Sequence, residues 1–133
     1  MRSRITFLKR HLARGFTMIE LLVALAIIAL LLAIAAPKYF GGIDRARETV
    51  LRENLYSLRE ALDKYYTDTG RYPDKLSDLV DKHYLRQIPE DPITESRNGW
   101  VVKPPADPSM GGVFDVHSGA AGVGKDGTYY QDW

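Results

Sequence analysis

Residues that could perform acid–base chemistry are few in this 133-residue chain. Among its three histidines, His117 lies two residues after Asp115 on a predicted strand, so both side chains project from one face and could form an acid–base pair. No candidate nucleophile, metal-ligand spacing or glycine-rich phosphate loop accompanies this pair. The sequence therefore predicts no catalytic activity, and His117 is interpreted as a surface or structural residue.

A different chemistry is indicated at Gly15-Phe16, where a basic leader meets an apolar run. Glu20 lies near the start of this run, and a carboxylate inside a membrane segment is costly and usually has a functional partner. If the chain is cut between Gly15 and Phe16, the new amino terminus is a cation that Glu20 of a neighbouring subunit could neutralise. A buried ion pair of this kind sets the register between subunits. This hypothesis predicts a cleaved protein that assembles into a filament.

Two simpler interpretations of the N-terminal segment remain open. A secretory signal peptide is indicated by the basic start and the small-x-small site at residues 33–35, although its apolar region is typically only about 7–15 residues long. A plain single-span anchor agrees with the 21 residues from Phe16 to Ala36, since a helix needs about 20 residues to cross a bilayer. The plain anchor gives Glu20 no role.

Residues 15–22, Gly-Phe-Thr-Met-Ile-Glu-Leu-Leu, resemble the prepilin-type cleavage and methylation signature of type IV pilins and type II secretion pseudopilins. The resemblance implies that a membrane-embedded prepilin peptidase cuts after Gly15 and N-methylates Phe16, and that Glu20 is the assembly glutamate. Pro37 falls where this family usually has a proline. Many relatives carry a glycine near the position of Ala29-Leu30, so Pro37 alone would have to break the helix during assembly.

Charge is unevenly distributed along the chain. Residues 1–15 carry five basic side chains and no acid, a charge of +5, whereas the remainder has 13 basic and 17 acidic residues, a charge of −4. A basic flank before an apolar span predicts a cytoplasmic N-terminus. With the resemblance, the expected location is the bacterial inner membrane, with a single pass and a periplasmic C-terminal head. The mildly acidic remainder indicates no nucleic-acid partner.

Beyond Pro37, apolar residues at three- and four-residue spacing predict an amphipathic helix: Ile43, Ala46, Val50, Leu51, Leu55, Leu58, Leu62 and Tyr65. The charged side chains between them are predicted to form a solvated face: Arg45, Arg52, Glu53, Arg59, Glu60 and Lys64. With Pro37 as a kink, we expect one helix from Phe16 to about Asp68. Gly70 suits a left-handed C-cap, and Pro73 cannot continue a helix.

After this helix, the pattern is that of short strands and loops. A short helix is predicted at residues 76–80, strands at 100–102 and 113–116 with a Pro/Gly-rich loop between them, and a weaker strand at 128–130. The predicted fold class is α+β, in which a long N-terminal helix, half transmembrane and half amphipathic, packs on a small antiparallel sheet, as in type IV pilins.

The expected organisation has three parts. Residues 1–15 form the leader, 16–37 the transmembrane or filament-core helix, and 38–133 the periplasmic head. Two stretches of this head resemble the major pseudopilins of type II secretion in particular. Residues 65–73 carry the pattern Y-x-x-D-x-G-R-Y-P, and residues 84–92 end in Pro-Glu-Asp-Pro.

The resemblance implies a structural subunit of a type II secretion pseudopilus, a filament that drives protein export across the outer membrane. Its expected partners are copies of itself in a helical homopolymer, the prepilin peptidase, other pseudopilins and the inner-membrane secretion platform. The alternative is a type IV pilin or minor pilin, with a role in adhesion, motility or DNA uptake, although the cysteine pair common in those proteins is missing. An anchored periplasmic binding module that never polymerises is a third possibility.

The glycine-rich stretch 118–127 raises the question of a metal, because in the pseudopilin family the equivalent loop typically binds calcium and ends in a tryptophan, here Trp133. The acidic positions of the family fall on residues 127–129, which carry no acid. Calcium takes about six to eight oxygen ligands, usually with several carboxylates. The sequence therefore commits to no cofactor and leaves calcium as a possibility with weak candidate ligands, namely Asp126, Asp132 and Asp115.

Overall fold

The computed structural model describes residues 15–133 and divides into two compact units between Tyr39 and Phe40. The basic leader predicted for residues 1–15 lies outside the described residues except for Gly15. We call residues 40–133 the head.

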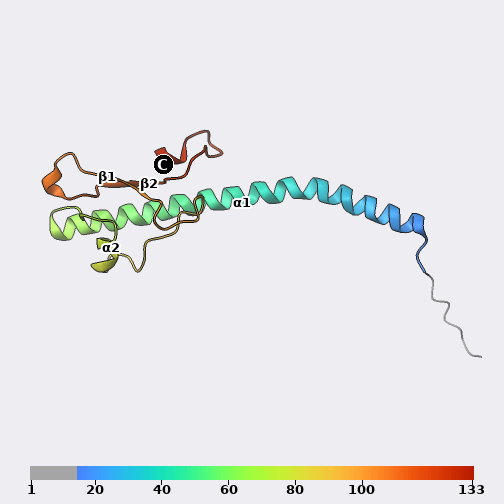
Figure 1. The fold of residues 1–133 in the computed structure, drawn as a ribbon, viewed down its shortest axis with the longest axis horizontal. Helices are drawn as coiled ribbons and strands as arrows, with labels where there is room; N and C mark the ends of the chain where they lie inside the picture. The colour runs from blue at the N-terminus through green and yellow to red at the C-terminus, as the bar shows by residue number, and fades with distance from the viewer. Residues whose placement is uncertain (1–14) are drawn as a thin grey trace, which may run out of the picture. The chain divides into compact units, whose positions relative to one another are not determined.

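Helix α1 is the longest element and runs from Met18 to Thr69 (Figure 1). Pro37 lies within it, so the expectation that this proline would not stop the helix is confirmed. The helix ends at Gly70, whose φ of 74° is left-handed and whose amide donates to the carbonyl of Tyr66 at 2.8 Å. Glycine adopts this conformation without the steric penalty of a Cβ atom, which explains the end of the helix.

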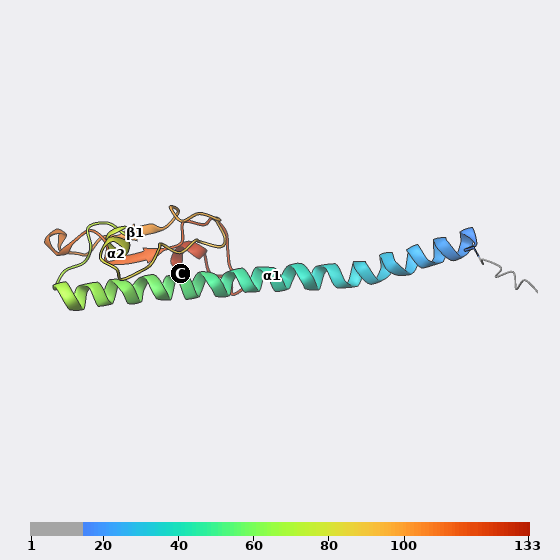
Figure 2. The same cartoon turned by 90° about the horizontal axis from the view of Figure 1, so that it is seen from below.

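The head contains short elements that follow the C-terminal half of α1. They are helix α2 (Asp78–Asp81), strand β1 (Val101–Lys103), the 3₁₀ helix η1 (Pro108–Met110), strand β2 (Asp115–His117) and the 3₁₀ helix η2 (Tyr130–Asp132). Strands β1 and β2 pair antiparallel, with Val102 opposite Val116. Figure 2 shows α2 and the strands on one side of the C-terminal half of α1. The predicted α+β class is confirmed.

The core of the head forms around four leucines of α1 at spacings of four, three and four residues: Leu51, Leu55, Leu58 and Leu62. They pack with Leu79 of α2, Trp100 before β1, Val113 before β2 and Val116 within β2. The predicted apolar face of the amphipathic helix is thus confirmed over this stretch, whereas Val50 is exposed. Each fully buried leucine contributes on the order of 2 kcal/mol through the removal of apolar surface from water.

All three strand predictions differ from the structure. The first strand is shifted by one residue, to Val101–Lys103. The second strand begins at Asp115 rather than Val113, because the amides of Gly112 and Val113 both donate to the carbonyl of Pro73 and are unavailable to a sheet. The third strand, predicted at residues 128–130, is wrong. The amide of Thr128 donates to the side chain of Asp126 in a turn. Tyr129 forms only an isolated β-bridge with Val123, and Tyr130 already begins η2.

Candidate functional site

The junction predicted for cleavage lies in an exposed stretch before the helix. Residues 15–17 adopt no regular secondary structure, and the Phe16 side chain is 87% exposed. A Cβ added at Gly15 would meet no atom within 4 Å. The Gly15–Phe16 peptide is therefore accessible and is not held in helical hydrogen bonds, as a peptidase substrate requires.

The start of α1 is fixed by a reciprocal pair of hydrogen bonds between Thr17 and Glu20. The Glu20 amide donates to Thr17 Oγ1 at 3.2 Å, and the Thr17 amide donates to Glu20 Oε2 at 3.1 Å. This is a capping box, which satisfies two amides that the first turn of a helix leaves without carbonyl partners. The sequence spacing T-x-x-E is typical of a capping box. An assignment of Glu20 to assembly alone therefore misses its role at the helix start.

Glu20 also borders a shallow groove on α1 with a volume of about 310 Å³, lined by Ile19, Glu20, Val23, Ala24 and Ile27. Among the described residues, no donor reaches the second carboxylate oxygen, Oε1. One oxygen of Glu20 thus holds the helix start, while the other is available to a group that enters from outside. The assembly role of Glu20, like that of Pro37, stays a prediction.

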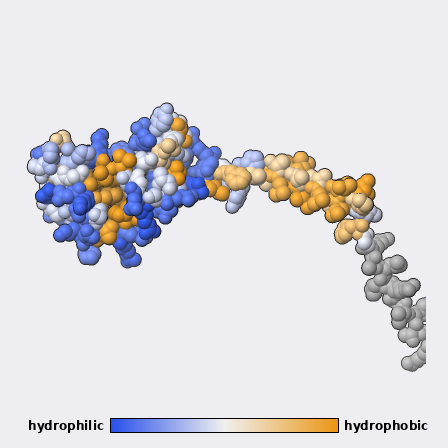
Figure 3. All heavy atoms as spheres, viewed as in Figure 1, coloured by the Kyte–Doolittle hydropathy of each residue, from blue (hydrophilic) through white to orange (hydrophobic). Residues whose placement is uncertain are grey.

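The first half of α1 is apolar around its circumference. Residues 15–40 are all exposed, and Figure 3 shows mainly apolar residues on the visible face of this segment. Within the described residues, one helix is long and apolar enough to cross a membrane; its best 18-residue window has a mean hydropathy of 2.9, and none of it is buried. A helix that is apolar all round requires lipid or other helices around it.

Asp115 and His117 do lie together, as the strand alternation predicts. His117 Nε2 is 3.3 Å from Asp115 Oδ2, and the other ring nitrogen, Nδ1, is 2.7 Å from the backbone oxygen of Trp133. The guanidinium of Arg59 donates to Asp115 Oδ1 at 2.8 Å and also to the backbone oxygens of Val116 and Trp133. Every polar side-chain atom of the pair thus has a partner. The contacts of His117 join β2 to Trp133, and those of Arg59 join both to α1.

The same contacts set the ionisation of Asp115. Burial raises the pKa of this carboxyl, but the amide of Val116 and the guanidinium of Arg59 favour the charged form and leave the pKa below its ordinary value. A carboxyl with a lowered pKa in the folded state stabilises the protein above its unfolded pKa. That stability is lost as the pH falls through the folded value.

We therefore expect Asp115→Asn to lower the melting temperature of the full-length chain in detergent at pH 6, with a deficit that shrinks between about pH 4 and pH 2. The reason is that acid protonates the wild-type carboxyl and so removes its negative charge, which the substitution removes at every pH. Tryptophan fluorescence follows unfolding of the head, because both tryptophans of the chain, Trp100 and Trp133, lie in it. A deficit of constant size from pH 6 to pH 2 would show that the charge of Asp115 contributes nothing.

The three weak candidates for calcium ligands do not form one site. Asp115 pairs with Arg59, and Asp126 pairs with Arg52 at 2.8 Å. Asp132 lies exposed in η2. Within residues 15–133, no group of three or more histidine, cysteine, aspartate or glutamate residues could hold a metal ion. The residues present therefore do not fit a calcium site, which needs about six to eight oxygen ligands.

The structure also reveals a buried carboxylate that sequence reasoning missed. Asp91 and Ser118 are both fully buried, and the Ser118 hydroxyl donates to Asp91 Oδ2. The amides of Ile93 and Thr94 donate to Asp91 Oδ1 at 2.8 and 3.3 Å. This residue belongs to the Pro-Glu-Asp-Pro stretch, and its burial gives that motif a structural role in joining the loop to the end of β2.

Comparison with known proteins agrees with this architecture. Residues 10–36 match the family described as "Prokaryotic N-terminal methylation motif". The chain is 30% identical to type II secretion system core protein G of Pseudomonas aeruginosa over 133 aligned residues, which cover 90% of this chain and 89% of the relative. It is 28% identical to the protein of the same name from Klebsiella michiganensis, over 84% of this chain and 78% of the relative.

A further relative is the type IV major pilin protein PilA of Myxococcus xanthus, at 32% identity over 83% of this chain but only 46% of the pilin. No solved structure matches the chain. A methylation motif at the head of an exposed apolar helix, followed by a small α+β head, defines a pilin-like protein anchored in a membrane. The similarity to the Pseudomonas protein extends over most of both chains, and the chain therefore belongs to the family of type II secretion system core protein G.

Proposed function

We propose that this chain is the major structural subunit of a type II secretion pseudopilus and has no catalytic activity of its own. The observation that carries the proposal is the similarity to core protein G along both the apolar helix and the head. In this role, the chain is inserted in the inner membrane by α1, with its N-terminus in the cytoplasm and its head in the periplasm. It then polymerises with copies of itself, with the other pseudopilins and the secretion platform as further partners.

Processing by a prepilin peptidase would precede assembly. The peptidase would cut the accessible Gly15–Phe16 peptide and methylate the new amine of Phe16. The capping box begins one residue later, at Thr17, so the cut leaves the hydrogen bonds at the helix start intact. The mature amine then lies at the end of an ordered helix rather than on a flexible tail.

The mature amine and Glu20 would then pair between neighbouring subunits. Each charge is costly in lipid by itself, and together they neutralise one another. Oε1 of Glu20 has no donor among the described residues and borders a groove in which a neighbour's N-terminus could lie. The apolar surfaces of the helices would supply close packing, and the ion pair would set their axial register.

The N-terminus of the mature protein tests the processing step. We expect mass spectrometry of the chain purified from cells with a prepilin peptidase to show N-methylated Phe16 as the first residue. Replacement of Gly15 by a bulky residue, in Gly15→Leu, should leave the leader attached in most molecules. Gly42→Ala is the control, because a Cβ atom added at this position of α1 would meet no atom within 4 Å, and this variant should be processed normally. A first residue of Ala36 would instead indicate an ordinary signal peptide, and Met1 a plain anchor.

A type IV pilin or minor pilin is the alternative, and the similarity to the Myxococcus pilin supports it. The match covers less than half of that pilin, whereas the match to the Pseudomonas core protein G covers most of both chains. Deletion of the gene separates the two functions. A pseudopilus subunit is needed for export of proteins to the medium, and a pilin for adhesion, motility or DNA uptake.

A further inference from the structure

The C-terminal segment 115–133 is tied to α1 by three charged side chains of the helix. Glu48, Arg52 and Arg59 are spaced by four and seven residues, which places them on one face of α1. Glu48 Oε1 accepts hydrogen bonds from the amide of Lys125 at 2.9 Å and from the hydroxyl of Tyr130 at 3.0 Å. Together with the contacts of Arg59 at β2, these bonds hold the whole segment against the helix.

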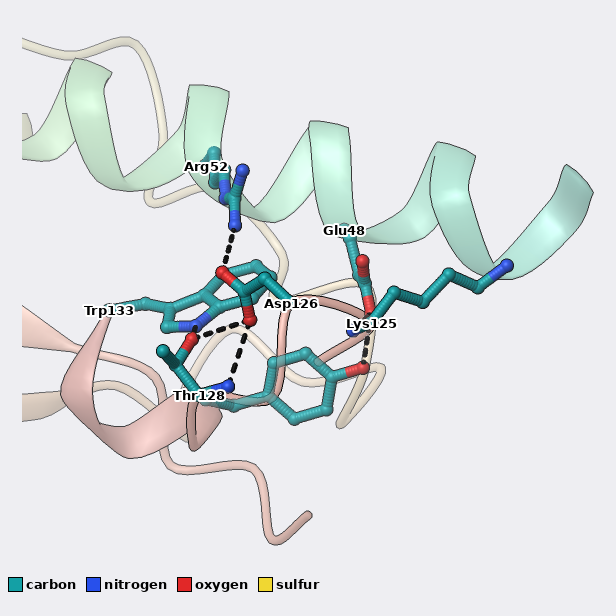
Figure 4. Close-up of polar contacts among 7 residues, drawn as sticks. Glu48, Arg52, Lys125, Asp126, Thr128 and Trp133 are labelled. Atoms are coloured by element: carbon teal, nitrogen blue, oxygen red, sulfur yellow. Dashed lines mark hydrogen bonds and ion pairs between the residues drawn. The ribbon is translucent and has the colours of Figure 1, made fainter. Parts of the chain in front are cut away.

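Arg52 projects from α1 toward Asp126 (Figure 4). Its Nη2 atom donates to Asp126 Oδ2 at 2.8 Å, and its guanidinium carbon lies 4.2 Å from the centre of a ring of Trp133. A guanidinium over an indole face is a favourable cation–π contact. One cation thus bridges the aspartate of the glycine-rich loop and the aromatic residue that packs beneath it.

The remaining oxygen of Asp126 is occupied as well. Asp126 Oδ1 accepts from the amide of Thr128 at 2.9 Å and from its hydroxyl at 2.6 Å, while Trp133 Nε1 donates to the same hydroxyl at 2.6 Å. The hydroxyl and amide of Thr128, together with the Arg52 guanidinium, lower the pKa of Asp126. The carboxylate is therefore ionised and fully engaged, with its charge matched by Arg52.

Glycine at position 124 completes the closed loop. Gly124 is buried, and a Cβ atom there would overlap the indole of Trp133. The loop backbone thus packs directly on the ring that Arg52 covers on the side of α1.

The carboxylates of this segment are placed differently from those of a calcium site. Calcium in a loop of this kind draws several carboxylates together around one ion. Here Asp115 and Asp126 are drawn to two different arginines of α1, Arg59 and Arg52. The cation that neutralises the loop is supplied by the chain itself.

We propose that the guanidinium of Arg52 takes the place of a calcium ion in this chain, because it neutralises Asp126 and closes the C-terminal loop over Trp133 against α1. The head therefore folds to the same stability with and without calcium. This inference concerns the head alone and does not depend on filament assembly.

The first test compares the melting temperature of the full-length chain in detergent in 1 mM calcium chloride and in 1 mM EGTA, followed by tryptophan fluorescence. We expect the two values to agree within about 1 °C. A cation present at a thousand times its dissociation constant would raise the melting temperature by roughly 15 °C or more. A rise of several degrees in calcium would overturn the proposal.

The second test removes the proposed internal cation. Arg52→Ala should lower the melting temperature by about 5 °C, as expected for one exposed ion pair together with one cation–π contact. Arg45→Ala is the matched control, because Arg45 is an exposed arginine of the same helix whose side chain makes no hydrogen bond, ion pair or ring contact with the described residues. Equal melting temperatures for the two variants would contradict the role of Arg52.

A double-mutant cycle separates the Arg52–Asp126 pair from other effects of Arg52. If the two side chains act together, Arg52→Ala combined with Asp126→Asn should lower the melting temperature by less than the sum of the single substitutions. Fully additive losses would show that Arg52 stabilises the head without Asp126, and would overturn the proposal.

Discussion

Glu20→Ala should leave the chain in the membrane and abolish its assembly. Without the carboxylate, the amine of a neighbouring Phe16 would lie unpaired among apolar helices, and an uncompensated buried charge costs about 3–5 kcal/mol. A loss of 3 kcal/mol corresponds to a factor of about a hundred in the association of two subunits. Formaldehyde cross-linking of membranes, followed by electrophoresis, should show a ladder of oligomers for the wild type and monomer for the variant.

The capping box makes Glu20→Ala ambiguous by itself, because the alanine also removes the acceptor for the Thr17 amide. Glu20→Gln resolves the ambiguity. Glutamine closes a capping box as glutamate does, but carries no charge. If the interchain ion pair is the main role of Glu20, then Glu20→Gln should lose assembly almost as completely as Glu20→Ala.

Thr17→Val is the converse control. Valine has nearly the shape of threonine and lacks the hydroxyl that accepts from the Glu20 amide, so the variant weakens the helix start by about 1 kcal/mol and leaves the carboxylate in place. We expect it to assemble. The opposite pattern, with assembly intact in Glu20→Gln and lost in Thr17→Val, would mean that Glu20 serves the helix start and that the ion pair does not form.

The parts of the fold that the sequence predicts well are those with a local period. Leu51, Leu55, Leu58 and Leu62 follow the helical repeat, and all four are buried. The end of α1 at Gly70 follows from the conformational freedom of one residue. Features of this kind can be predicted from neighbouring residues alone, because they do not depend on contacts with distant parts of the chain.

The parts that the sequence does not predict depend on bonds between distant residues. Strand β2 begins late because Gly112 and Val113 bond to Pro73, some forty residues earlier in the chain. Arg52, predicted to be part of a solvated face, is indeed exposed but bonds to Asp126, 74 residues away. A helix face rich in charges gives no sign of which charges will find a partner elsewhere in the chain.

Asp91 is the clearest case of a residue whose role is visible only in the folded protein. It lies between two prolines in a stretch that predicts an extended loop. In the structure, it is fully buried and accepts hydrogen bonds from two amides of its own loop and from Ser118. Ser118 Oγ in turn accepts from the amide of Ala120 at 3.1 Å. The chain of bonds joins the loop after α2 to the segment that leaves β2.

Asp91→Ala should therefore be among the most destabilising single substitutions in the head. It leaves the fully buried hydroxyl of Ser118 without its acceptor, and it also removes the acceptor of the part-buried amide hydrogen bonds from Ile93 and Thr94. Buried polar groups left without partners cost about 1–3 kcal/mol each, so we expect a loss of about 3 kcal/mol in the free energy of unfolding. Urea titration of the full-length chain in detergent, followed by tryptophan fluorescence, measures this loss.

Asp91→Asn should cost only about 1 kcal/mol, because the amide oxygen can still accept from the backbone and only the bond from Ser118 must be rearranged. Asp81→Ala, an exposed position at the end of α2, controls for the removal of an aspartate from the head and should change the free energy by less than about 0.5 kcal/mol. The order of the three variants is the decisive result. If Asp91→Ala were as stable as Asp81→Ala, the buried bonds would contribute nothing, and the Pro-Glu-Asp-Pro stretch would owe its role to its prolines alone.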